Sequence, residues 1–487
     1  MSDRRSRIAV TCVLMAAALL LSPNVLERVR AQSTGWSAPV LLETEGGDAQ
    51  HPQVSMDRTG NATVVWFQWN GSRNEIRANR FEPAAGWRGA EILSNETSPD
   101  GLEPWSAMGP RSEALVAWEE WDGSVYNIAA RGNNPTIGWG TAVVLWSTVG
   151  WPLYHPRVAI DPSGAAQVVW EGWDGTGSRI YSARYAPETG WEPSAPLGPT
   201  GSDAHYPEIA VDPQGNAIAA WYAGGARADV WASRYRPGFG WATPVLLDTS
   251  SAGDAFNPLV AMDAQGNGIV VWQQYDGTRW GVWAARYDAS AGWLGVTQLD
   301  DKAGDAEAPR IAVSPLGFAT AVWSERTSGR SVIWASRFNP AVGWSGPETV
   351  SEALPWSGSA PQITLDDLGR SSVIWTQVNG TASDIYASRA GATGGWEAPV
   401  RISSGTLISR APRLAANEQG SAIAVWEEAG NGPANVWAAL FTPPTPATNP
   451  PSSSNLSLPT AIALVAIGVL VGMLLVLAFS RRRRPRP

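Results

Sequence analysis

Residues 154–197 read YHPRVAIDPSGAAQVVWEGWDGTGSRIYSARYAPETGWEPSAPL. The segments HPRVAID, AAQVVWEG, RIYSARY and EPSAPL each have the length and composition of a short β-strand. They are separated by PSG, WDGTGS and APETGW, which are rich in the residues that favour tight turns. We denote the four predicted strands A, B, C and D. Four short strands joined by hairpin turns predict one antiparallel sheet.

This unit recurs along the chain with two tryptophans in fixed places. A Gly-Trp pair returns every 50 to 52 residues, and a second tryptophan lies in each strand B. The Gly-Trp series is Trp36, Trp87, Trp139, Trp191, Trp241, Trp293, Trp344 and Trp396, and the strand-B series is Trp66, Trp118, Trp170, Trp221, Trp272, Trp323, Trp375 and Trp426. Repeats of this length are characteristic of β-propeller blades. Because both faces of a blade pack on neighbours, the strands are expected to be apolar on both sides.

The order of the strands predicts an all-β fold of about eight four-stranded blades over residues 35–441. Residues 36–42 resemble a strand D with no strand A, B or C before it, whereas residues 412–441 supply A, B and C. Pairing these two segments closes the ring and removes exposed sheet edges. A seven-bladed ring is the competing arrangement, because Gly109 in the second unit replaces the aspartate found at Asp161 and Asp212.

The A–B turns carry a resemblance to known propellers. The sequence VDPQGNA at 211–217 resembles the D-x-x-G-N turn of NHL-type propellers. It also resembles the Asp-box turn of sialidase-like propellers, in which the aspartate, glycine and aromatic residue stand closer together. The resemblance covers residues 35–441 and implies a propeller fold, and no functional residue is carried over from either family.

The two ends of the chain predict export and membrane anchoring. Residues 1–31 have the basic start, apolar run and distal small residue of a signal peptide, with an uncleaved anchor as the alternative. Residues 442–457 are rich in proline and serine and predict an extended stalk. Residues 458–480 contain 20 successive uncharged residues, enough to span a bilayer. The arginines of 481–487 then predict a cytoplasmic tail and an exterior N-terminal domain.

Charge and cysteine content narrow the classes of partner and compartment. Without the two ends the chain has 25 Lys and Arg against 42 Asp and Glu, a net charge of −17. This argues against nucleic acid or an anionic membrane surface as a partner. The one cysteine, Cys12, lies in the signal segment, so the exported part has no disulfide. These features together favour a prokaryotic cell-surface protein with a single membrane span.

The topology assigns the loops to two faces. The A–B and C–D turns share one face and are regular, whereas the B–C and D–A loops share the other, the D–A/B–C face. Loops on a rigid scaffold commonly carry function, and the three histidines of the chain fall here. The candidate ligand-binding residues on this face are Asp48, His51, Trp69, Glu120, Trp121, His155, Trp173, Asp203, His205, Asp254, Tyr275 and Asp305.

Each of these residue types also has a structural interpretation. Asp-Gly and Asn-Gly are ordinary hairpin turns, the aspartates of the D–A loops can cap turns, and the aromatic residues can pack between blades. Aromatic rings beside carboxylates and amides are, however, what a sugar-binding surface requires. Two or three such carboxylates also suit Ca²⁺, and no other cofactor is expected. The metal itself is not assigned.

Arginines recur at a fixed place on strand C in seven of the eight units. They are Arg80, Arg131, Arg184, Arg234, Arg286, Arg337 and Arg389. One packing role repeated in each blade predicts a structural function for them, not the arginine cluster of a sialidase.

The sequence therefore favours a membrane-anchored recognition or adhesion module that binds a glycan or protein on the D–A/B–C face. A structural surface component without a small ligand is the first alternative. A sialidase-like glycosidase is the second, because catalysis by paired carboxylates requires a separation that sequence does not give. No catalytic acid–base set is recognisable in the sequence.

Overall fold

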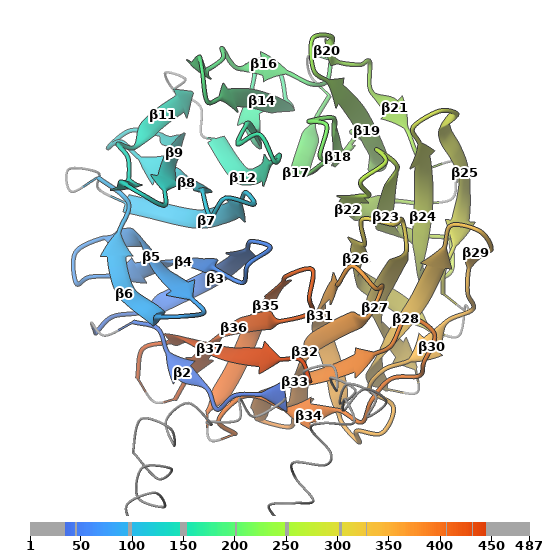
Figure 1. Ribbon diagram of the computed structural model, residues 1–487. Coiled ribbons are helices and arrows are strands. Elements are labelled where there is room, and N and C mark those ends of the chain that lie inside the picture. Colours follow the sequence, from blue (N-terminus) through green and yellow to red (C-terminus); the bar gives the residue numbers. More distant parts are fainter. Residues whose placement is uncertain are drawn as a thin grey trace, which may run out of the picture. The chain divides into compact units, whose positions relative to one another are not determined.

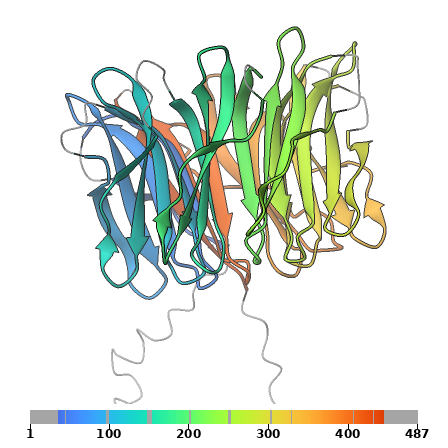
Figure 2. The same cartoon turned by 90° about the horizontal axis from the view of Figure 1, so that it is seen from above.

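The computed structural model describes residues 35–43, 46–95, 100–146, 153–199, 202–248, 253–300, 304–327, 329–405, 407–430 and 432–444. Within these ranges the chain forms strands and turns arranged as a ring of small sheets around a central axis (Figure 1). Seen at right angles to that axis, the strands run between the two faces of the ring (Figure 2). The all-β propeller expected from the sequence is confirmed.

The third blade shows the unit. Its strands are β12 (Leu153–Ile160), β13 (Ala166–Trp173), β14 (Ser178–Ala186), β15 (Gly190–Trp191) and β16 (Ala195–Pro196). Strands β12, β13 and β14 pair antiparallel in sequence order, and β15 and β16 both pair with β14. The predicted strands A, B and C are confirmed, whereas strand D is divided into two short segments.

The other blades repeat this arrangement. Blade 1 has β3 (Ala49–Met56), β4 (Ala62–Trp69), β5 (Asn74–Glu82) and β6 (Gly86–Ile92), and blade 2 has β7 (Asp100–Met108), β8 (Ala114–Trp121), β9 (Tyr126–Asn134), β10 (Gly138–Trp139) and β11 (Val143–Trp146). Blade 4 has β17 (Ala204–Val211), β18 (Ala217–Ala223), β19 (Asp229–Arg236), β20 (Gly240–Trp241) and β21 (Val245–Leu246), and blade 5 has β22 (Ala255–Met262), β23 (Gly268–Tyr275), β24 (Trp280–Asp288) and β25 (Gly292–Gln298). Blade 6 has β26 (Asp305–Val313), β27 (Ala319–Thr327), β28 (Arg330–Asn339), β29 (Gly343–Trp344) and β30 (Glu348–Thr349), and blade 7 has β31 (Ser357–Leu365), β32 (Ser371–Asn379), β33 (Ala382–Ala390) and β34 (Val400–Arg401).

Blade 8 closes the ring with strands from both ends of the propeller. It contains β35 (Ile408–Ala416), β36 (Ala422–Ala429) and β37 (Asn435–Thr442), and β37 pairs with β1 (Gly35–Trp36) and β2 (Val40–Leu41). The predicted closure by an N-terminal strand is confirmed. The eight A–B–C sets among the described residues favour eight blades over the seven-bladed alternative.

Proline explains why strand D is broken in most blades. Blades 1 and 5, whose strand D is a continuous seven residues, have no proline shortly after the Gly-Trp pair. In blades 4 and 6, Pro244 and Pro347 follow that pair, and the strand resumes beyond them for two residues. Proline lacks the N–H of a ladder hydrogen bond and is tolerated at a sheet edge. The break therefore falls on the outermost strand, which has no further strand to pair with on its outer side.

The strand-B tryptophans form the contacts between blades. All eight are at most 2% exposed, and they lie in clusters that combine residues of adjacent blades, as Trp170 does with Leu115 of blade 2. In five blades the indole N–H donates to a glutamine or glutamate two residues further on, at 2.7 to 3.1 Å. A buried indole thus keeps a hydrogen-bond partner inside an apolar layer.

The strand-C arginines need one correction. In six blades the arginine pairs with the residue three before the strand-B tryptophan, as Arg286 pairs with Ile269. In blade 2 the residue at this register is Gly132, which pairs with Leu115, and Arg131 precedes it. Since neighbouring residues on a strand point to opposite faces, Arg131 does not share the role of the other six. Its guanidinium instead donates to the carbonyls of Leu93 and Gly140.

Among the described residues there is no helix long and apolar enough to cross a membrane. The predicted signal peptide at 1–31, the membrane span at 458–480 and the tail at 481–487 lie outside those residues, as does the stalk beyond residue 444. These segments remain predictions from the sequence.

Closure of the ring can be tested at two adjacent leucines. Leu42 is 2% exposed and packs in the cluster between blades 8 and 1, whereas Leu41 is 42% exposed. We expect Leu42→Ala to lower the free energy of unfolding by about 2–4 kcal/mol, because it removes buried methyl groups and leaves a cavity. Leu41→Ala is the control and should change it by less than about 0.5 kcal/mol. Denaturant unfolding measures both, and equal effects would show that the N-terminal segment does not close the ring.

Candidate functional site

A repeated backbone irregularity sets the inner rim of the ring. Each innermost strand (β3, β7, β12, β17, β22, β26, β31 and β35) has a register shift, as between Tyr154 and Arg157 of β12. The residue at this bulge precedes a proline and has a φ of 46° to 54°, the left-handed region that side chains other than glycine seldom adopt. The eight residues are His51, Glu103, His155, Tyr206, Asn257, Ala308, Ala360 and Ala411. A bulge redirects the strand's side chains.

Polar side chains of the preceding blade hold several of these bulges. The residue after the strand-B tryptophan accepts a hydrogen bond from the bulge N–H of the next blade. Glu427 accepts from His51 at 2.7 Å, Glu119 from His155 at 2.9 Å, and Gln273 from Ala308 at 3.1 Å. The same hydrogen bonds join blade to blade and satisfy an amide that the bulge withdraws from the sheet.

Two histidines meet one glutamate at the start of blades 3 and 4. Glu171 of blade 3 accepts from His205 Nδ1 at 2.9 Å and lies 3.4 Å from His155 Nδ1. The ring of His155 stacks on Tyr206, with centroids 4.1 Å apart, and Tyr206 remains 44% exposed. The predicted sites His155 and His205 are therefore neighbours, although 50 residues separate them in sequence. His51 lies in blade 1 and pairs instead with Glu103 of blade 2, at 2.6 Å.

The carboxyl groups of this cluster have opposite pKa shifts. Burial raises the pKa of Glu119 to about 7, since one backbone N–H from His155 offsets only part of the desolvation. Burial also disfavours the Glu171 carboxylate, but hydrogen bonds from His155 and His205 prevail and lower its pKa to about 2. The hydrogen bond to Glu171 in turn raises the pKa of His205. Near neutral pH Glu171 is therefore ionised, whereas Glu119 on the adjacent blade is still partly protonated.

Three arginines lie one step further along the innermost strands. Arg157, Arg310 and Arg413 each follow the proline of the bulge, and each donates through one terminal nitrogen to that proline's carbonyl at 3.0 Å. Arg157 also donates to Glu208 at 2.8 Å and lies 4.0 Å over the ring of Trp105. Arg413 donates to Gln53 at 2.9 Å. We call the three the axial arginines.

The axial arginines converge although they come from blades 3, 6 and 8. Desolvation lowers the pKa of Arg413 to about 10, and the charges of Arg310 and Arg157 lower it further than Glu208 and Glu103 restore. Desolvation also lowers the pKa of Arg310, although the charge of Glu208 raises it by more than the charge of Arg157 lowers it. Among the described residues Arg157 alone of the three forms an ion pair, with Glu208. The arrangement therefore holds positive charge in excess of its carboxylate partners.

Three of the four predicted aspartates of the D–A loops have a structural role. Asp48 accepts from the N–H of Ala434 at 2.7 Å, Asp254 from Ala228 at 3.0 Å, and Asp305 from Trp280 at 3.0 Å. Each carboxylate thereby caps the first residues of strand C in the preceding blade. Asp203 differs, because it lies 3.3 Å from His205 Nε2 and its side chain is 49% exposed.

The predicted aromatic residues of the B–C hairpins are spread around the D–A/B–C face, not gathered at one point. Trp121 packs on Tyr126 and Tyr275 on Trp280, with centroids 5.0 and 5.5 Å apart within their own hairpins. Trp69 is 42% exposed, and Trp173 at the end of β13 is half-buried. Glu120 is only 6% exposed. It occupies the position from which other blades accept the tryptophan N–H, so its placement indicates a packing role.

The sequence interpretation missed Glu103, Glu119, Glu171 and the axial arginines. A signal was present, since arginine follows the strand-A proline in units 3, 6 and 8, and glutamate follows the strand-B tryptophan in units 2, 3 and 8. Among the described residues no group of three or more His, Cys, Asp or Glu side chains is arranged to hold a metal ion.

Comparisons with known proteins give distant likenesses only. No family model matches the chain, and no curated protein sequence matches it. Among solved structures it is similar to an ulvan lyase of a polysaccharide lyase family (12% identity, TM-score 0.47, covering 68% of this chain and 90% of that one). It is also similar to the intramolecular trans-sialidase from Ruminococcus gnavus (10% identity, TM-score 0.41, 71% and 95% covered). A third is a protein of unknown function from Dyadobacter fermentans (12% identity, TM-score 0.39, 83% and 98% covered). With TM-scores below 0.5, these likenesses carry no argument about activity.

Because Glu119 is buried, replacing it by a neutral residue is expected to raise the free energy of unfolding, by an amount that depends on pH. Its pKa is about 7 in the folded chain against an ordinary value of 4.5, so folding stability is lost as pH rises from about 4.5 to 7. We expect Glu119→Gln to be more stable than wild type at pH 8 by up to about 3 kcal/mol, with a smaller difference at pH 4.5. Urea unfolding of both proteins at each pH measures the change.

Glu103→Gln serves as the control of opposite sign. His51 and other nearby positive charges, against the effect of burial, lower the pKa of Glu103, so its contribution is present above the unfolded pKa and is lost as pH falls. This variant should lose stability relative to wild type at pH 6 and lose less at pH 3. The assignment of Glu119 would be wrong if both variants had the same pH trend.

Proposed function

We propose that this chain is a membrane-anchored extracytoplasmic recognition module whose ligand is an anionic glycan, bound at the inner rim on the D–A/B–C side. The observation that carries the proposal is the convergence of the axial arginines, Arg157, Arg310 and Arg413. Desolvation lowers the pKa of Arg310 and of Arg413, and repulsion from the other two arginines lowers that of Arg413 further. A bound carboxylate or sulfate would relieve that repulsion through charge-assisted, often bidentate, hydrogen bonds.

The surroundings of the axial arginines support a sugar as the carrier of that charge. Tyr206 offers an exposed ring stacked on His155, and flat apolar surfaces of this kind suit the faces of saccharide rings. Glu171, His155 and His205 supply hydrogen-bonding groups held in fixed orientation by their own contacts. Without its two terminal segments the chain has a net charge of −17, so these arginines are a local positive group on an acidic protein. This favours selective binding of an anion at this point over attraction of anions to the whole surface.

Binding can be tested with paired acidic and neutral oligosaccharides. Wild type should bind uronate-bearing or sulfated glycans, and Arg310→Gln and Arg413→Gln should each weaken binding by about tenfold or more, as expected for lost charge-assisted hydrogen bonds. Arg88→Gln is the control, since Arg88 lies on the outer strand β6 and pairs with Glu82 of β5. Calorimetric titration at two salt concentrations measures the affinities. Equal binding of neutral glycans, or unchanged binding by both variants, would exclude this function.

Catalysis is the second candidate, favoured by the carboxyl groups Glu119 and Glu171 on adjacent blades with opposite pKa shifts. Such a pair separates an acid from an ionised carboxylate, as acid–base cleavage of a glycan requires. The same titrations, followed by analysis of glycan length, distinguish the two functions. Shortened products that Glu119→Gln fails to form would make the protein an enzyme, whereas intact glycan supports recognition alone.

We also propose that residues 458–480 anchor the propeller on the outer face of the membrane. The support is the length and apolar character of that segment and the arginines that follow it. Removal of residues 458–487 should release the propeller from the membrane fraction, while the full chain stays with it and is accessible to externally added protease. Retention of the shortened chain in the membrane would point to an uncleaved N-terminal segment as the anchor.

A further inference from the structure

The repeated strand-C arginine fills the space between one blade and the next on the A–B/C–D side. In blades 4 to 7 its guanidinium lies over an aromatic ring of the following blade: Arg234 lies over Tyr287 at 4.9 Å and Arg286 over Phe338 at 5.4 Å. Arg337 and Arg389 do the same over Trp396 and Phe441, at 5.4 and 3.8 Å. Stacking of a guanidinium on an aromatic face is favourable, more so where water is excluded. The repeat therefore shows which chemical group this space accommodates.

Blade 2 lacks this arginine. Gly132 pairs with Leu115 at the register where Arg286 pairs with Ile269. On the facing side of blade 3, Tyr185 is present and packs on Trp191 with centroids 5.4 Å apart, as in other blades. Blade 3 thus keeps the aromatic surface, while blade 2 does not supply the cation that covers it elsewhere.

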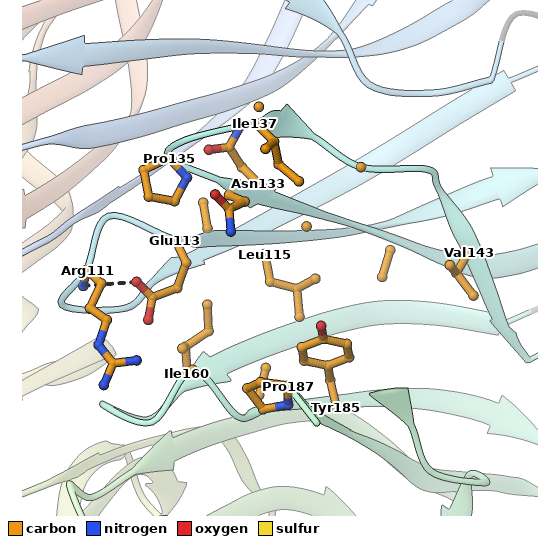
Figure 3. A pocket seen from close by; sticks show the side chains of 18 of the residues that line it. Arg111, Glu113, Leu115, Asn133, Pro135, Ile137, Val143, Ile160, Tyr185 and Pro187 are labelled. Atoms are coloured by element: carbon orange, nitrogen blue, oxygen red, sulfur yellow. Dashed lines mark hydrogen bonds between the residues drawn. The ribbon is translucent and has the colours of Figure 1, made fainter. Parts of the chain in front are cut away.

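A pocket of about 610 Å³ occupies this position between blades 2 and 3 (Figure 3). Leu115, Ile160 and Tyr185 line it together with Gly132 and Pro187. The corresponding space between blades 5 and 6, which Arg286 occupies, measures about 170 Å³. The larger volume lies within the range of small-ligand sites. The absence of a side chain at Gly132 explains part of the difference.

A carboxylate faces the vacant position. In blades 4 and 5 the aspartates of the A–B turns, Asp212 and Asp263, approach the A–B turn glycine of the next blade. Their Oδ2 atoms lie 2.9 and 3.1 Å from the position that a Cβ on that glycine would occupy. Blade 2 has Gly109 there, but Glu113 Oε1 takes the same place, 3.5 Å from the Cβ position of Gly164. Its other oxygen accepts from the N–H of Arg111 at 2.9 Å. Among the described residues no cationic side chain pairs with Glu113.

We propose that the pocket between blades 2 and 3 binds a guanidinium group on an alkyl chain, presented as an arginine side chain of a partner polypeptide. The guanidinium stacks on Tyr185 and pairs with Glu113, in the place that an arginine of the chain itself takes in other blades. Leu115 and Ile160 contact the alkyl chain. The pocket lies on the face opposite the candidate glycan site and does not depend on it.

The test uses the full chain in detergent and three probes: a blocked arginine with acetylated and amidated ends, a blocked citrulline, and a Gly-Arg-Gly tripeptide. Blocked arginine should bind saturably. Citrulline, which has nearly the same shape without the charge, should bind at least tenfold more weakly. No saturable binding of either arginine probe, or equal affinity for citrulline, overturns the proposal. If the tripeptide binds more tightly than blocked arginine, the ligand is an arginine of a polypeptide. If the two bind equally well, the site is assigned to a free guanidinium compound, and the proposal of a polypeptide partner is overturned.

Gly132→Arg is the decisive variant. No atom lies closer than 3.9 Å to the Cβ position of Gly132, so the arginine can enter the pocket as it does in other blades. We expect loss of arginine binding by at least tenfold with an unfolding midpoint equal to or above wild type. Gly295→Arg, which adds the same charge on the open edge strand β25, should bind as wild type does.

Glu113→Gln keeps the proposal testable if Gly132→Arg does not fold. It retains the size of the side chain and removes its charge, and it should weaken binding of blocked arginine about tenfold while leaving citrulline unchanged. Arginine binding that survives both Gly132→Arg and Glu113→Gln overturns the assignment of the pocket.

Discussion

The propeller depends on the burial of one tryptophan per blade against the next blade. A single four-stranded sheet of this composition has two apolar faces and cannot bury either alone. Each strand-B tryptophan, such as Trp272, lies within the layer shared by two blades, and in five blades its N–H donates to a side chain two residues away. A polar group is thereby buried without an unmet hydrogen bond. The requirement applies to every junction, so the ring is stable only when it is complete.

The candidate site uses a second repeated device, the left-handed residue before the strand-A proline. Such a residue carries a conformational cost of about 1–3 kcal/mol, and eight copies persist because the surrounding sheet and the hydrogen bonds from neighbouring blades impose them. The bulge interrupts the regular alternation of side chains along the strand, so that it directs to the inner rim side chains that an unbroken strand would direct elsewhere. Blades 6, 7 and 8 have alanine at this position, whereas blades 1 to 4 have histidine, glutamate or tyrosine. The titratable and aromatic bulge residues are therefore concentrated in blades 1 to 4, whereas two of the axial arginines, Arg310 and Arg413, lie in blades 6 and 8.

Much of the fold could be predicted from the sequence, because the features that specify it are local or repeated. The two tryptophan series locate every blade, and the lone strand D at residues 36–42 indicates closure. The site was predicted only to the level of a face. His155 and His205 were identified, but Glu119 and Arg310 were not, since the placement of each depends on bulges that shift the strand register and on the curvature of the whole ring. Arg131 was misassigned for a similar reason. It lies one residue before the repeated position on strand C, which a spacing of about 51 residues does not reveal, but its side chain points to the opposite face of the blade.

Closure by β1 and β2 also has a consequence for the order of folding. The last blade contains the first strands of the propeller and the last, β37. A chain that emerges from its N-terminus must therefore keep residues 35–42 unpaired through the addition of some 390 residues, until its final strand becomes available. During that interval the growing row of blades has an open apolar face at each end. These two faces are covered only when β37 pairs with β1 and β2, so the chain is exposed to aggregation until its last strand has been made.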